Sequence, residues 1–139
     1  MKEQCDFPAF TAYLLEDDIL HIEIKQVDKL YPKDIEQVKD YFIETGMGDK
    51  VFTLTTFQGF IPIGYETMKA AVKYFKQNMI GAKACAVENL ALRMTMRLFI
   101  KFYKPNYPIA IFNTQHEALA WLKEQKIKEK KKTTSLDAV

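Results

Sequence analysis

The segment VFTLTTF at residues 51–57 decides the fold that the sequence predicts. Its residues are mostly β-branched or aromatic, and apolar side chains fall in both phases of an extended chain, as in a strand that is covered on both faces. AKACAVEN at 82–89 is a second candidate for a buried strand, and YPIAIF at 107–112 is the last strand. We expect these three strands to lie side by side and to run in the same direction.

Helical patterns alternate with these strands. Apolar residues recur at helical spacing at about 33–46, 65–79, 90–104 and 112–124. Pro32 suits the first turn of the first helix, Gly81 the end of the second and Pro105 the end of the third. Thr114 and Glu117 form a capping box at the start of the last helix. Such an alternation requires right-handed crossovers and therefore a mostly parallel sheet with helices against it.

Two short apolar runs, at 9–16 and 19–25, precede the first helix, and Asp17-Asp18 between them suits a tight hairpin. The predicted order is ββαβαβαβα. We therefore expect an α/β fold in one domain over residues 1–124, with a mixed, mostly parallel five-stranded sheet, an N-terminal β-hairpin and four helices. Residues 125–139 are too polar to bury, and we expect them to form a basic, disordered tail.

The composition excludes several classes of protein. With 139 residues, 48% of them hydrophobic and 27% charged, the chain matches one globular domain that needs neither disulfides nor a structural metal. No apolar stretch approaches the roughly 18 residues of a membrane span, and the acidic N-terminus does not resemble a secretory signal, so we expect a soluble, cytoplasmic protein. Residues 123–139 carry six lysines on an otherwise near-neutral chain, a distribution that does not indicate a specific nucleic-acid partner.

No catalytic, cofactor-binding or metal-binding motif is present. Gly59 and Gly64 are too few and too far apart for a phosphate-binding loop. His21 and His116 lie on different predicted elements, and the two cysteines are far apart in the sequence. We therefore expect no cofactor, no metal ion and no enzymatic activity.

The segment LALRMTMRLFIKFYK at 90–104 carries two unusual patterns. A basic stripe lies within an arc of roughly 80° of the predicted helix: Arg93, Arg97, Lys101 and Lys104. It is either a docking face for an acidic partner, phosphate groups or lipid headgroups, or an ordinary solvated surface. Apolar residues cover roughly 240° of the circumference, more than a helix on a sheet needs. The excess should be covered by another part of the chain or by a second subunit, and we expect a homodimer through this candidate partner face: Leu92, Met96, Phe99 and Tyr103.

A candidate ligand crevice is expected at the carboxyl ends of the parallel strands, where open α/β sheets bind ligands. The residues brought together there are Phe57, Gln58, Phe60, Glu88, Asn89, Asn113 and Thr114. This aromatic recess suits a small apolar ligand or a peptide. The alternative is a packed loop in which Phe60 and Ile61 fill the core.

The order of elements over residues 9–124 resembles the STAS-like fold of bacterial anti-sigma-factor antagonists, and the segment KFYKPNYPIAIFNTQHEALAWL at 101–122 resembles the last strand and helix of its divergent members. In those antagonists, the loop between the third strand and the following helix carries an Asp-Ser and Ser-Gly motif, and the Ser of this motif is phosphorylated. This chain has TTFQGF at 55–60 with no Ser, so the resemblance does not extend to the phosphorylation switch.

The resemblance implies a non-catalytic protein that acts through protein contacts in bacterial regulation, as a homodimer or with another protein. The alternative is a module that binds a small ligand or lipid in the crevice.

Overall fold

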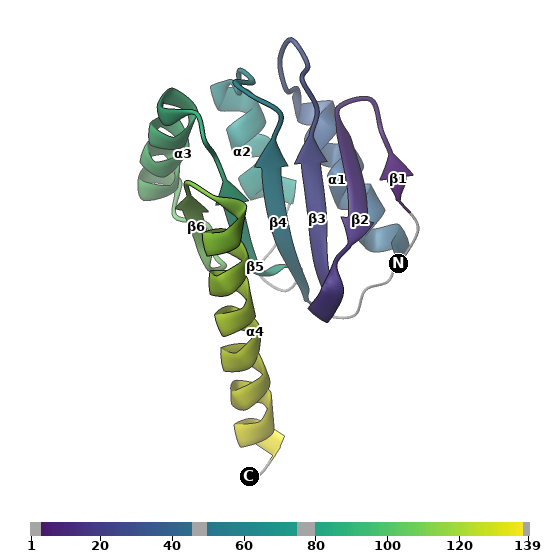
Figure 1. Ribbon diagram of the computed structural model, residues 1–139, viewed down its shortest axis with the longest axis vertical. Helices are drawn as coiled ribbons and strands as arrows, with labels where there is room; N and C mark the ends of the chain where they lie inside the picture. The colour runs from purple at the N-terminus through teal and green to yellow at the C-terminus, as the bar shows by residue number, and fades with distance from the viewer. Residues whose placement is uncertain (1–3, 46–49, 75–79, 138–139) are drawn as a thin grey trace.

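The computed structural model describes residues 4–45, 50–74 and 80–137 of an α/β protein built on one sheet (Figure 1). The strands are β1 (Cys5–Asp6), β2 (Phe10–Leu14), β3 (Ile19–Ile24), β4 (Val51–Phe57), β5 (Ile80–Ala86) and β6 (Ile109–Phe112). The helices are α1 (Pro32–Thr45), α2 (Tyr65–Tyr74), α3 (Leu90–Tyr103) and α4 (Gln115–Asp137).

The strands lie in the sheet in the order of the sequence. β1, β2 and β3 are antiparallel neighbours, while β3, β4, β5 and β6 are all parallel. The predicted parallel arrangement of β4, β5 and β6 is therefore confirmed. The predicted five strands were one too few, because β1 has two residues and is too short to show a periodic pattern.

The turn between β2 and β3 is the predicted hairpin. Asp17 and Asp18 have φ angles of 64° and 56°, in the left-handed region that Asp tolerates better than most residues. The backbone N–H of Leu15 donates to the carbonyl of Ile19 at 2.7 Å and closes the turn. The two consecutive aspartates thus fix the turn that sets β2 antiparallel to β3.

The two faces of the sheet have different covers. Figure 1 shows α4 on one face, over β5 and β6, and α1, α2 and α3 on the other. Strand alternation sends Phe52 and Leu54 to the α4 face, where they pack with Ala118 and Leu122 of that helix. Val51 points to the opposite face, into the core beneath α1.

The predicted second helix and the strand predicted at 82–89 meet differently in the structure. α2 is described as far as Tyr74, and the rest of its predicted span, 75–79, lies outside the described residues. Gly81, predicted to end that helix, lies inside β5. A Cβ at Gly81 would stand 2.5 Å from the Phe52 ring, so the glycine is needed where the ring crosses the strand.

The predicted disordered tail at 125–139 also differs from the structure, in which α4 continues to Asp137. Lysine, glutamate and glutamine favour helices even where they bury little surface. Lys50 forms an ion pair with Glu129 at 2.9 Å, and the amine of Lys126 donates to the carbonyl of Asp17. These contacts tie the helix to the rest of the protein beyond its apolar part.

Candidate functional site

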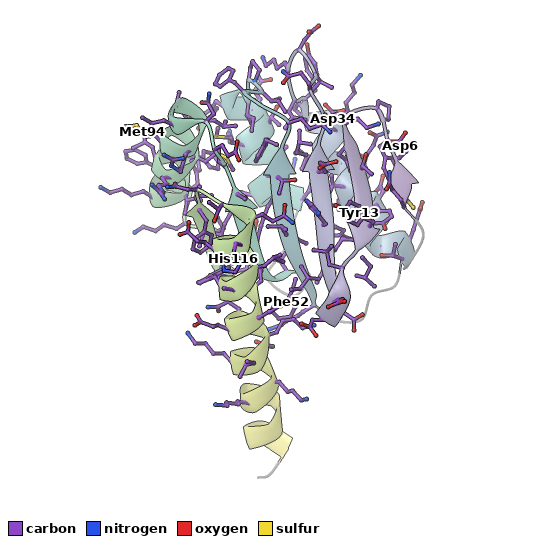
Figure 2. All side chains as sticks on the ribbon, in the orientation of Figure 1. Asp6, Tyr13, Asp34, Phe52, Met94 and His116 are labelled. Carbon is purple, nitrogen blue, oxygen red and sulfur yellow. The ribbon has the colours of Figure 1, made fainter. Side chains whose placement is uncertain are left out.

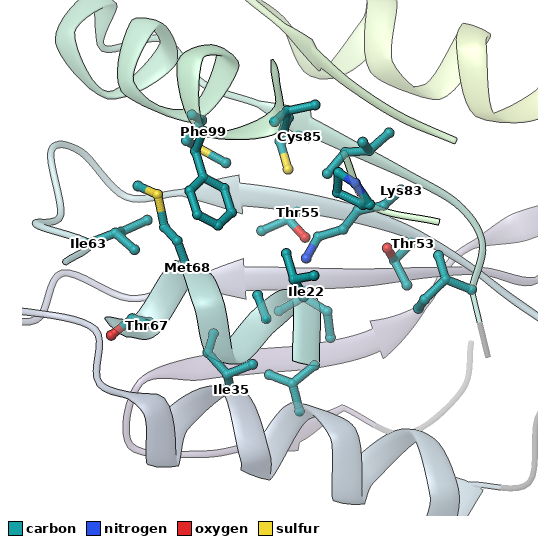
Figure 3. A pocket seen from close by; sticks show the side chains of 18 of the residues that line it. Ile22, Ile35, Thr53, Thr55, Ile63, Thr67, Met68, Lys83, Cys85 and Phe99 are labelled. Atoms are coloured by element: carbon teal, nitrogen blue, oxygen red, sulfur yellow. The ribbon is translucent and has the colours of Figure 1, made fainter. Parts of the chain in front are cut away.

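A cavity of about 120 Å³ lies between the sheet and the helices α1, α2 and α3 (Figure 3). Strands β3, β4, β5 and β6 contribute its floor, and the three helices contribute its other walls. The apolar side chains that line it include Ile22, Ile35, Phe57, Met68, Phe99 and Ile109. Protein interiors are otherwise closely packed, so a space of this size is a distinct feature of the domain.

Four side chains make the floor of the cavity less apolar than its walls: Thr53, Thr55, Lys83 and Cys85. In the parallel register of β4 and β5, Thr53 pairs with Lys83 and Thr55 pairs with Cys85. The four residues therefore form one compact patch. Figure 3 shows the Lys83 side chain extended along the floor toward Thr55.

Thr53 is the most unusual member of this patch. It is 1% exposed, and its hydroxyl has no hydrogen-bond partner among the described residues. Thr67, on the helical side of the cavity, is also deeply buried, but its hydroxyl donates to the carbonyl of Leu30 at 2.8 Å. Buried hydroxyls nearly always have a partner, so the hydroxyl of Thr53 is available to a polar group placed in the cavity.

Burial also controls the ionisation of two groups at the cavity. It raises the pKa of the Cys85 thiol, and Lys83 opposes this effect. It likewise raises the pKa of the Tyr107 hydroxyl, which Lys83 again opposes. Both groups are neutral at pH 7. A thiol in this state is a poor nucleophile, so the arrangement favours binding over covalent chemistry.

The structure places the members of the predicted ligand crevice in different surroundings. Phe57 lines the cavity, but Phe60 is exposed. Asn89 accepts from the N–H of Leu92 at 2.9 Å and Thr114 accepts from the N–H of Glu117 at 3.2 Å, so both cap helices. The remaining predicted members are Gln58, Glu88 and Asn113, and all three are exposed.

The apolar excess of α3 is divided between two faces. The chain itself covers part of the predicted partner face: Leu92 is buried, Met96 and Phe99 are half-buried and line the cavity, and the half-buried Tyr103 stacks on Phe99 with 4.3 Å between ring centroids. The apolar side chains that stay exposed form a different stripe, Leu90, Met94, Leu98 and Phe102. Figure 2 shows Met94 pointing away from the sheet. A partner surface on α3 would therefore lie on this exposed stripe.

Two side chains of the predicted basic stripe form hydrogen bonds to the backbone within the protein. Arg93 donates to the carbonyl of Val87 at 2.8 Å, and Arg97 donates to the carbonyl of Ile111 at 3.0 Å. These bonds tie α3 to the carboxyl ends of β5 and β6. Lys104 ends the helix in a left-handed conformation, with φ at 41°. Lys101 remains an exposed charge beside the apolar stripe.

Sequence reasoning missed Thr53 and Lys83. Both lie within predicted strands, where threonine is usually a packing residue. The available signal was the single lysine in the otherwise apolar run AKACA at 82–86, in the same strand phase as Cys85. That signal identifies a charge on one face of the strand, but the cavity above it depends on the helices.

Comparisons with known proteins place this chain in a family. Residues 13–126 match the model of a domain of unknown function, DUF7793. The chain belongs to this family. No curated protein matches the chain.

Among solved structures, this DUF7793 domain is similar to an uncharacterized protein of the DUF3478 family with a SpoIIAA-like fold, from Shewanella loihica. The TM-score is 0.54 and the identity 18%, over 82% of this chain and 92% of that chain. The likeness confirms the predicted STAS-like fold.

Two other observations concern the described residues. None of the described helices has an apolar stretch of the length and composition that a bilayer crossing requires. The same residues contain no cluster of three or more His, Cys, Asp or Glu side chains that would suit a metal ion.

Proposed function

We propose that this domain is a non-catalytic binding module that holds a small apolar ligand in the cavity between the sheet and α1, α2 and α3. The cavity itself carries the proposal. Its volume of about 120 Å³ approaches the roughly 150 Å³ of an engineered apolar cavity that binds benzene.

The proposed site lies deeper than the crevice expected from the sequence. Phe57 is common to both, but the ligand would lie beneath the helices and not at the strand ends. Phe99 and Met68 provide flat and flexible apolar surfaces on the helical side, while β-branched residues line much of the sheet side. Such a wall suits a compact ring or a branched hydrocarbon.

Benzene tests this proposal directly. It should raise the melting temperature of the protein, and the rise should continue to grow with the logarithm of the benzene concentration above the dissociation constant. Ala71 of α2 lines the cavity, so Ala71→Leu should fill part of the space and remove the response to benzene. Ala120→Leu is the matched control, because Ala120 is exposed on α4. A parent protein that ignores benzene, or an Ala71→Leu variant that responds like the parent, contradicts the proposal.

The exposed stripe of α3 supports a second function, self-association as a homodimer. Leu90, Met94, Leu98 and Phe102 follow one another at intervals of four residues, and Phe102 is 72% exposed. A continuous apolar stripe of this kind usually marks a contact site. Two copies of α3 could bury their stripes against each other around a twofold axis.

The mass in solution decides between the monomer and the dimer. We expect light scattering at tens of micromolar to give the mass of two chains for the parent and of one chain for Leu98→Glu, with unchanged circular dichroism. Ala120→Glu adds the same charge to an exposed position of α4 and should leave the dimer intact. A monomeric parent would rule out this second function, and a dimeric Leu98→Glu variant would place the contact elsewhere.

A further inference from the structure

The floor of the cavity has the features of a site for a carboxylate group. Thr53 and Lys83 are paired residues of adjacent parallel strands, and both line the cavity. Neighbouring strands are about 4.8 Å apart, so the two side chains leave the floor close to each other. A lysine ammonium offers three N–H donors and a threonine hydroxyl offers one O–H donor.

The hydroxyl of Thr53 provides a second, independent observation in favour of a carboxylate site. It is buried within the protein and has no hydrogen-bond partner among the described residues. Leaving such a group unsatisfied is costly, and an acceptor atom of a ligand removes that cost. Thr55, two residues further along the same strand face, adds another hydroxyl to the same floor.

The charge of the cavity points to an anion. The described residues that line it include the basic Lys83 and no aspartate or glutamate. An anion carrying a single charge matches this composition, whereas a doubly charged group would incur a larger desolvation penalty in a small apolar space. A carboxylate fits further, because its two oxygens can accept from Lys83 and Thr53 at the same time.

We infer that the ligand of this site is a small carboxylic acid anion with a compact apolar body. This inference rests on the proposed function and adds the chemical class of the ligand. The carboxylate accepts from the Lys83 ammonium and the Thr53 hydroxyl on the floor. The body packs between Phe99 and Met68 on the helices and Ile22 on the sheet, and the cavity limits it to about the size of a six-membered ring.

Benzoate and benzamide provide the test, because they share one shape and differ in charge. At pH 7 we expect the parent protein to bind benzoate about tenfold to a hundredfold more tightly than benzamide, as measured by isothermal titration calorimetry. Lys83→Met should remove this preference while the affinity for benzamide changes little. Thr53→Val should lower the affinity for benzoate by about tenfold, because the variant keeps the shape of the side chain and loses the hydroxyl donor.

Lys73→Met is the matched control, since Lys73 is an exposed lysine of α2, and it should leave the preference for benzoate intact. If benzoate and benzamide bind the parent equally, the inference is wrong. It is also wrong if benzoate binds equally well to the parent and to Thr53→Val and Lys83→Met. The comparison of the two ligands on the parent protein remains decisive even if Lys83→Met does not fold.

Benzene separates the ligand class from the proposed function. If benzene binds in the cavity and benzoate has no advantage over benzamide, the proposed function stands and the carboxylate inference falls. If neither benzene nor the two benzoyl compounds bind, both fall together. If benzoate displaces benzene from the parent but not from Lys83→Met, both are supported.

Discussion

Thr53 of β4 and Lys83 of β5 are paired in the parallel register of the sheet, and both face the cavity beneath the helices. They are far apart in the sequence, and α2 lies between them. The crossover from β4 through α2 to β5 is what places the hydroxyl beside the lysine. The same crossover supplies Met68, which lines the cavity above them. One βαβ unit therefore provides both the polar floor and part of the apolar wall.

The stability of the protein should depend on pH through His21 of β3. His21 is 2% exposed, its Nε2 lies 2.8 Å from the hydroxyl oxygen of Thr56, and its Nδ1 has no partner among the described residues. Burial lowers the pKa of His21 below its ordinary value of 6.5, against a smaller opposite effect of Glu23. The unfolded chain then binds a proton at a higher pH than the folded protein does.

The contribution of His21 to the free energy of unfolding should therefore be largest well above pH 6.5, where His21 is neutral in both states. It should fall as the pH drops below 6.5 and level off, as regards His21, once the folded protein is protonated as well. Urea denaturation between pH 7.5 and about 5 measures this slope. His21→Gln should flatten the slope in that window, while His116→Gln, at an exposed position, should not. Equal slopes in the parent and His21→Gln would contradict the assignment.

Gly81→Ala should destabilise the protein by about 1–3 kcal/mol, the usual cost of forcing extra atoms into a packed site. The new Cβ would stand 2.5 Å from a ring carbon of Phe52, which is itself buried. Gly64→Ala is the control, because its Cβ would meet the flexible Lys29 side chain at 3.4 Å. Thermal denaturation of the two variants should show a lower melting temperature for Gly81→Ala alone. Similar melting temperatures would show that the Phe52 ring has room to move.

Asn89 should act as the cap of α3 and not as part of a ligand site. Its side chain accepts from the N–H of Leu92 at 2.9 Å. Asn89→Ala should therefore cost about 0.5–2 kcal/mol of stability, and Asn89→Asp, which keeps an acceptor at the cap, should cost much less. Chemical denaturation measures both, and calorimetry with benzoate provides the second readout. A variant that keeps its stability but loses ligand binding would show that Asn89 belongs to a ligand site, as the crevice predicted from the sequence requires.

The sequence by itself determined the order and type of the main elements. The apolar runs at 51–57, 82–89 and 107–112 and the helical periodicity between them require strands joined by crossover helices. Local signals of this kind were sufficient wherever the physical cause is local. Asp17-Asp18 forms the predicted hairpin turn. Thr114 accepts from the backbone N–H of Glu117 as predicted, while the Glu117 carboxylate accepts from the Thr114 hydroxyl.

Only the tertiary structure decided which faces matter. The apolar residues of α3 surround too much of the helix for periodicity to show which side meets the sheet, so Leu98 and Phe99 could not be told apart as exposed and inward residues. The cavity is a volume left between layers, and no pattern in one segment encodes it. Lys83 and Thr53 form a candidate binding site only because long-range contacts bring them together. Strand pairing and the three covering helices place the charge of Lys83 and the unsatisfied hydroxyl of Thr53 in the same apolar space.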